Sequence, residues 1–364
     1  MKRCVSLRQI IFMLIISLFA LKVLLLPNLM AKDMGRDIYI FIFILCVIDF
    51  IVLLMFIYLM NKFKDKSFFE IISSIFGEHV SRIIMLALML FFFAKACGAF
   101  QSCYVYLNEN LYTTYTWLTY SLPILLVLIL CIQNGLNSFG RLVEVCLPLI
   151  AVGFFVAIFV GVIRADVTNL LPILENAEYK FSKLTTFAFW FGDYLVLIPF
   201  FGRVKLEKGS LKKIIISIII SALLLVVFYA VIYSRYSYNI ISHTNSISDI
   251  LQVQPSSSDI GNFDWVLILI WDICLFIYIC LNTISASSCF KEAFYPIKQI
   301  YVSMFLCLAI FLVNFFARFN IYSFVNLAEN SLMYYSIALQ YILPLIIFVF
   351  ALFKKRRTNE VSIA

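Results

Sequence analysis

Long apolar segments alternate with short polar ones along the whole chain, and this pattern predicts a protein that crosses a membrane many times. A membrane-spanning helix needs about 20 mainly apolar residues. Ten segments meet this requirement, at residues 7–30, 37–60, 82–106, 117–134, 141–163, 184–202, 211–234, 264–288, 299–317 and 331–353. Between the second and third, residues 67–79 place apolar side chains at helical spacing beside a polar face, which predicts a short helix on the membrane surface.

Two of the ten segments carry residues that disturb a helix. The sixth contains Gly192, Asp193 and Pro199, and the first contains Lys22 and Pro27. A charge inside a membrane is costly unless it is paired, so by default it marks a functional site. The first and sixth segments hold matching positions in two halves of five, and this arrangement predicts a transporter-like inverted repeat with a binding site near the midplane.

The pattern therefore predicts an all-α integral membrane protein that forms a single polytopic domain over residues 1–364. Repeat one covers about 7–163, repeat two about 184–353, and a basic cytoplasmic tail 354–364. Discontinuous helices 1 and 6 leave unpaired backbone N–H and C=O groups at the break. Such groups can hold the carboxylate and the ammonium of an amino acid.

Composition and charge agree with this class of protein. Hydrophobic residues make up 64% of the chain and charged residues 13%, which excludes an ordinary soluble domain. Of the 28 Lys and Arg residues, 19 fall on one side of the predicted spans and 7 on the other. This asymmetry predicts that both termini are cytoplasmic, and it assigns the basic charge to topology, with no nucleic acid as partner.

Motifs for catalysis are missing from the sequence. It contains no Gly-rich phosphate loop, no Ser/His/Asp set, no metal-ligand spacing and no cofactor fingerprint. The ten cysteines are scattered through apolar segments without a CxxC pair, which is typical of reduced structural thiols. We therefore expect no enzyme activity, no cofactor and no metal.

Four intramembrane charges suggest two ion pairs. Lys22 and Asp193 would face each other across the centre of an inverted-repeat bundle. Their pair either serves function, with the lysine in place of a coupling cation or a substrate ammonium, or only fixes helix packing. Asp49 and Lys95 lie about midway along the second and third spans and are expected to form a second, structural pair.

Three further charged residues are candidates for gating or coupling. Arg141 and Glu144 are spaced i, i+3 at the start of the fifth span, where they can bond each other and a neighbouring helix as an inner gate or folding clamp. Asp272, in the eighth span, is a candidate proton or cation site together with one of the serines at 285, 287 and 288.

Several motifs resemble those of the B subunits of endospore germinant receptors, the germination permeases of the amino acid-polyamine-organocation superfamily. The resemblance runs from about residue 6 to 350. The matching segments are Ser6–Gln9, Leu24–Pro27, Gly135-Leu136 with Arg141–Glu144 and Pro148, Asn169–Pro172, Phe191–Asp193, and Asn262–Asp264 with Trp271. One departure is Ala20-Leu21-Lys22, where the family usually has a GTG-type sequence.

The resemblance implies a ten-helix LeuT-like fold, a location in the spore inner membrane or cell membrane, and partnership with an A-type membrane subunit and a C-type lipoprotein. It implies a receptor subunit that binds a small, amino acid-like germinant near the helix breaks and signals germination. Two alternatives stay open. One is a proton-coupled secondary transporter of amino acids or cations, and the other is a structural receptor subunit whose ligand site has decayed.

Overall fold

Helices form the regular structure of the protein. The computed structural model describes residues 5–110, 117–204, 209–242, 264–294, 297–317 and 321–353, and no strand occurs among them. The basic tail at 354–364 and the Asn262-Phe263 part of one family motif lie outside these residues. The α-helices are α1 Leu7–Leu24, α2 Leu26–Met34, α3 Ile38–Lys62, α4 Phe68–Phe76, α5 Glu78–Asn110, α6 Trp117–Ile163, α7 Ala177–Ser182, α8 Ser210–Tyr236, α10 Asp264–Ala293, α11 Gln299–Ala317, α12 Ile321–Glu329, α13 Ser331–Ile337 and α14 Leu343–Phe353. Shorter 3-10 segments are η1 Gly35–Asp37, η2 Val167–Leu170, η3 Leu184–Trp190, η4 Asp193–Phe200 and η5 Ser237–Ser242, and η6 Ala338–Ile342 is a π-helix.

Seven helical stretches of the described residues are long and apolar enough to cross a membrane. They are Leu7–Leu24, Leu26–Lys62, Glu78–Asn108, Gly135–Ile163, Ser210–Ser242, Val266–Ala293 and Ser331–Phe353. Two shorter apolar helices, Trp117–Gln133 and Ile300–Phe316, occupy the predicted fourth and ninth spans. The predicted sixth span consists of η3 and η4. The protein is thus a multi-pass, all-helical membrane protein, and the count of ten spans stays a prediction.

Two interruptions in the bundle differ in kind. Between α1 and α2 only Leu25 intervenes, and its backbone keeps helical angles (φ −97°, ψ −35°), so the predicted discontinuity in the first span is slight. Pro27 lies at the start of α2, where its missing N–H costs no helical hydrogen bond. The long α6 bends sharply at Gly135, whose φ of 77° and ψ of 173° separate the predicted fourth and fifth spans.

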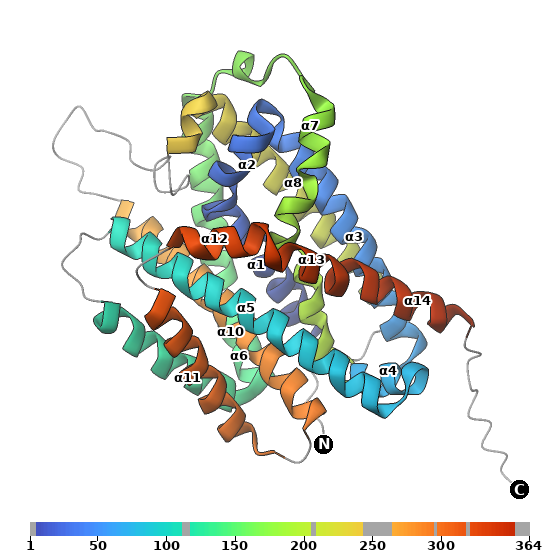
Figure 1. Ribbon diagram of the computed structural model, residues 1–364. Coiled ribbons are helices and arrows are strands. Elements are labelled where there is room, and N and C mark those ends of the chain that lie inside the picture. Colours follow the sequence, from blue (N-terminus) through green and yellow to red (C-terminus); the bar gives the residue numbers. More distant parts are fainter. Residues whose placement is uncertain are drawn as a thin grey trace, which may run out of the picture.

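The central helix of the bundle is α1, which contacts α6, α8 and α10 (Figure 1). Along its side α5 packs against α10, while α3 packs against α8. The C-terminal helices α12 and α13 cover η3, and α14 lies against α3. A short helix forms where the sequence predicted one, α4, and it begins at a capping box between Ser67 and Glu70.

Two ion pairs attach the segment that follows α6 to the residues just before α3. The fully buried Asp37 forms an ion pair with Lys180 and accepts the N–H of Leu174 at 2.9 Å. Arg36 forms a looser pair with Glu175, at 3.4 Å. This segment contains η2 and α7.

Replacing Asp37 by Ala is predicted to destabilise the protein by about 3 kcal/mol, because Lys180 is left as a buried charge without its partner. Thermal unfolding in detergent, followed by size-exclusion chromatography, measures the change. Glu175→Ala is the matched control and should cost under about 1 kcal/mol, because that side chain is 55% exposed. Equal losses in the two variants would contradict the assignment of Asp37 as the anchor.

Candidate functional site

The sixth span is broken at two residues. Segment η3 ends at Trp190, Phe191 is extended (φ −108°, ψ −165°), and Gly192 is left-handed (φ 76°, ψ 26°) before η4 begins at Asp193. Glycine adopts the left-handed conformation without the steric cost that a Cβ atom brings. The break lies inside the protein, since all four of these residues are buried.

Side chains from two other helices satisfy the backbone groups at this break. The Gly192 N–H donates to both carboxylate oxygens of Asp49 on α3, at 3.0 and 3.2 Å. The ammonium of Lys95 on α5 donates to the Phe191 carbonyl. Within lipid, unsatisfied backbone groups are strongly unfavourable, so these contacts stabilise the break.

The predicted ion pair between Asp49 and Lys95 does not form. Both residues lie at the depth of the break, as their positions in the sequence suggested, but each binds a backbone group of opposite polarity there. The carboxylate takes the N–H and the ammonium takes the C=O. These are the interactions expected of a bound amino acid, and here the chain's own side chains make them.

The other predicted pair, between Lys22 and Asp193, is present. Lys22 on α1 forms an ion pair with Asp193, and the two side chains are each 1% exposed. Asp193 also lies 3.4 Å from the ammonium of Lys95 and accepts a hydrogen bond from Tyr278 at 3.4 Å. One carboxylate therefore joins α1 and α5 to the broken span. We call Lys22, Asp49, Lys95 and Asp193 the central cluster, in which two lysines balance two aspartates.

Aromatic residues position Lys22. Its ammonium lies 4.6 Å from the centre of the Phe191 ring, a cation–π contact, and its carbonyl accepts a hydrogen bond from Tyr229 at 2.7 Å. Pro27 is buried a little over one turn further along. Because Leu25 keeps helical angles, the first span has no wide break here, and Lys22 reaches Asp193 from a regular helix.

Three residues of the site were not predicted. Tyr278 contacts Asp193, Tyr341 donates to Asp49 at 3.0 Å, and Gln340 packs against Gly192. Gln340 is fully buried, and its amide nitrogen and oxygen lack hydrogen-bond partners among the described residues. It lies in the π-helix η6, and π-helical turns frequently occur at functional sites. In the sequence, the one feature that could have identified these three residues is that each is polar and lies inside an apolar span.

The predicted bond between Arg141 and Glu144 is replaced by contacts to α1. Glu144 accepts a hydrogen bond from Gln9 at 3.3 Å and lies 3.7 Å from Arg8, while the side chain of Arg141 is exposed. The side chain of Gln9 lies 2.8 Å from where a Cβ of residue 140 would be, so Gly140 permits this close approach. Glu144 thus ties the start of α1 to α6.

Asp272 lies away from the central cluster, and its predicted serine partners are too distant. Its carboxylate accepts a hydrogen bond from the Cys103 thiol at 2.7 Å. Ser285 follows it by 13 residues on the same helix, a rise of about 20 Å, and its hydroxyl donates to the Leu281 carbonyl. The prediction of a site shared by Asp272 and these serines is therefore wrong. Among the described residues, no set of three or more His, Cys, Asp and Glu side chains is arranged to hold a metal ion.

Removal of Asp193 is predicted to be more damaging than removal of Lys22. Asp193→Asn deprives two buried lysines of their shared partner and should cost about 3 kcal/mol or more, whereas Lys22→Met leaves Asp193 in contact with Lys95. The measurement is the unfolding temperature of the purified variants, with the exposed Lys212→Gln as the control. A larger loss for Lys22→Met would contradict the shared-partner geometry.

Gly192→Ala is predicted to destabilise the break in two ways. The new Cβ meets the Gln340 side chain, and alanine at a φ of 76° costs about 1 kcal/mol. The double variant with Gln340→Ala should recover the steric part and keep the backbone part. A thermodynamic cycle over the two single variants and the double variant measures the coupling, and strict additivity would contradict the contact.

Comparisons with known proteins agree with this architecture. A model of the spore germination protein family, a family of spore permeases, matches residues 4–323, which include the central cluster and its break. No curated protein matches the chain. The match confirms the resemblance seen in the sequence motifs and covers most of the length of the chain. This protein therefore belongs to the spore germination protein family and is a multi-pass, permease-like membrane protein related to germination.

Proposed function

We propose that the protein is the membrane subunit of a germinant receptor and that a small amino acid-like germinant acts at the break of the sixth span. The observation that carries this proposal is the pair of contacts at the break, from Asp49 to the Gly192 N–H and from Lys95 to the Phe191 carbonyl. They display the two chemical groups of an amino acid in the places where a ligand would bind.

A ligand would act by exchange with these side chains. Its ammonium competes with Lys22 and Lys95 for Asp193 and the Phe191 carbonyl, and its carboxylate competes with Asp49 for the Gly192 N–H. The central cluster is balanced in charge, and a zwitterion adds no net charge to it. Exchange therefore avoids burying an uncompensated charge, which would be strongly unfavourable.

Release of Lys22 from Asp193 would loosen α1 from the broken span. Helix α1 also contacts α6, α8 and α10, so a change in its position alters contacts across the bundle. In this proposal the shift is the signal passed to an A-type membrane subunit and a C-type lipoprotein in the spore inner membrane. The proposal assumes a ten-span arrangement of two inverted repeats, with both termini on the spore-core side.

A second candidate is a structural subunit without a ligand. The full occupation of the break by the chain's own side chains favours it, because the closed cluster is complete without any small molecule. A proton-coupled secondary transporter is the third candidate retained from the sequence.

Germination of spores that carry Lys22→Met tests the proposal. The variant removes one internal competitor, so we expect the amino acid concentration for half-maximal germination to fall about tenfold, equivalent to 1.4 kcal/mol. A panel of single amino acids serves as germinants, immunoblots control the protein level, and exposed Lys213→Met is the matched control.

The alternatives give different results. If germination changes only in proportion to the protein level, with no shift in concentration, the protein is a structural subunit. Saturable uptake of a labelled amino acid into proteoliposomes that contain this chain alone would instead identify a transporter.

A further inference from the structure

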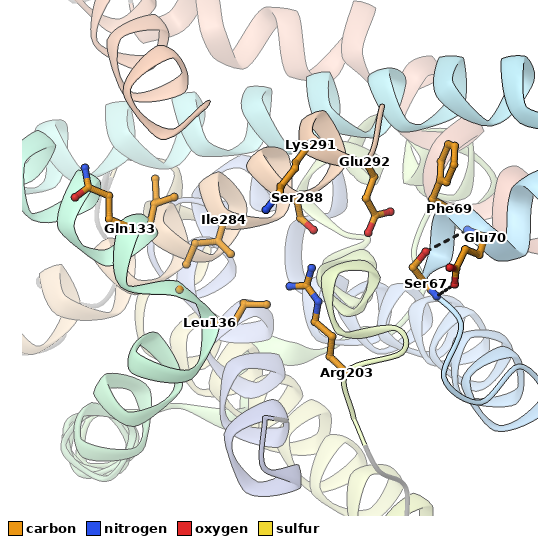
Figure 2. A pocket seen from close by; sticks show the side chains of 12 residues that line it. Ser67, Phe69, Glu70, Gln133, Leu136, Arg203, Ile284, Ser288, Lys291 and Glu292 are labelled. Carbon is orange, nitrogen blue, oxygen red and sulfur yellow. Dashed lines mark hydrogen bonds between the residues drawn. The ribbon is translucent and has the colours of Figure 1, made fainter. Parts of the chain in front are cut away.

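A cavity lies away from the central cluster. Its volume is about 610 Å³, and it forms where four segments meet: the start of α4, the bend of α6 at Gly135, the chain just after η4, and the last turns of α10 (Figure 2). Small-molecule sites usually measure about 300 to 1,000 Å³. We call this space the inner cavity.

The four segments belong to the same side of the protein. The distribution of basic residues places each of them on the cytoplasmic side of the predicted spans. Along α10, Ser288 follows Tyr278 of the central site by ten residues, a rise of about 15 Å. The inner cavity is therefore separate from the break and open to a different set of ligands.

Arg203 supplies the clearest binding group. Its half-buried side chain points into the inner cavity, toward Ser288 and Lys291 on α10 (Figure 2). Within the part of the chain that the structure describes, no carboxylate forms an ion pair with it. The guanidinium presents a rigid fork of N–H donors that matches a carboxylate. These groups favour a ligand with an anionic end.

Acidic and apolar residues narrow the choice of ligand. Glu70 and Glu292 line the inner cavity together with Arg203 and Lys291, so its charged lining is balanced and favours a ligand with one positive and one negative group over a dianion. Glu70 accepts the Ser67 N–H at 2.7 Å in its capping box, and the Glu292 carboxylate extends into the inner cavity on the side of Arg203 (Figure 2). Leu136 and Ile284 provide an apolar wall for a short side chain.

We propose that the inner cavity is a second binding site, for a small zwitterion of the amino acid class. Its carboxylate binds Arg203 with help from Ser288, its ammonium faces Glu292, and its side chain packs on Leu136 and Ile284. The site accepts ligand from the cytoplasmic side. It does not depend on exchange within the central cluster, so it holds whether the protein is a receptor or a structural subunit.

Binding of radiolabelled L-alanine to the purified full-length protein in phosphatidylcholine nanodiscs tests this site. We expect saturable binding that glycine and L-valine displace and that succinate, a dianion, does not. Arg203→Gln should weaken the binding about tenfold, because it removes charge-assisted hydrogen bonds. Lys212→Gln, which removes an exposed positive charge at the start of α8 outside the inner cavity, should leave binding unchanged.

A second variant separates loss of the site from loss of the fold. Ser288→Leu fills the inner cavity without removing a charge and should abolish the component of binding that Arg203→Gln weakens, with the unfolding temperature of each variant measured alongside. Absence of L-alanine binding to the unmodified protein, binding that survives both variants, or displacement by succinate as strong as by glycine would each overturn the proposal. Binding that is lost only when the central cluster is altered would place the ligand at the break and would also overturn it.

Discussion

A backbone interruption inside a membrane leaves polar groups that lipid cannot satisfy, and here Asp49 and Lys95 satisfy them. The carboxylate of Asp49 accepts the Gly192 N–H, and the ammonium of Lys95 donates to the Phe191 carbonyl. Each of these side chains would be unfavourable in an apolar interior by itself. The backbone groups at the break stabilise the two charged side chains, and the side chains stabilise the break. Removal of either would leave the other without a partner.

This mutual dependence explains how the surrounding helices pack. Lys22 brings α1 to the break and Lys95 brings α5, with Asp193 as their shared partner. Tyr341 adds the C-terminal part of the chain through Asp49. Elements from both halves of the sequence thus meet at one electrically balanced cluster, and apolar packing of the remaining residues fills the space around it.

The two proposals put a ligand at two unlike places, the closed central cluster and the inner cavity. At the break, a small molecule has to replace groups that already have partners, which makes binding a competition and links it to movement of α1. The inner cavity has open volume and a guanidinium without an ion-pair partner in the described part of the chain. In the two proposals, the same class of molecule binds by competition at the break and by direct occupation of open volume in the inner cavity.

The amino-acid pattern by itself determined the features that are local. Runs of apolar residues located the spans, and Gly192, Asp193 and Lys22 marked the positions where a regular apolar helix would be disturbed, because a single residue is enough to reveal a missing side chain or a charge. The motifs around Gly135 and Arg141–Glu144 pointed to the family. The pair of Lys22 with Asp193 followed from the matching places of the two spans in the predicted halves.

Only the tertiary structure decided which groups meet. Asp49 binds a backbone N–H instead of Lys95, Glu144 binds Gln9 instead of Arg141, and Asp272 binds Cys103. These pairings depend on how neighbouring helices are rotated about their axes and on their relative depth in the membrane. A pattern of apolar residues does not determine either of these quantities. The inner cavity had no signal of its own, because its lining comes from four segments far apart in the chain that become neighbours only after the bundle has packed.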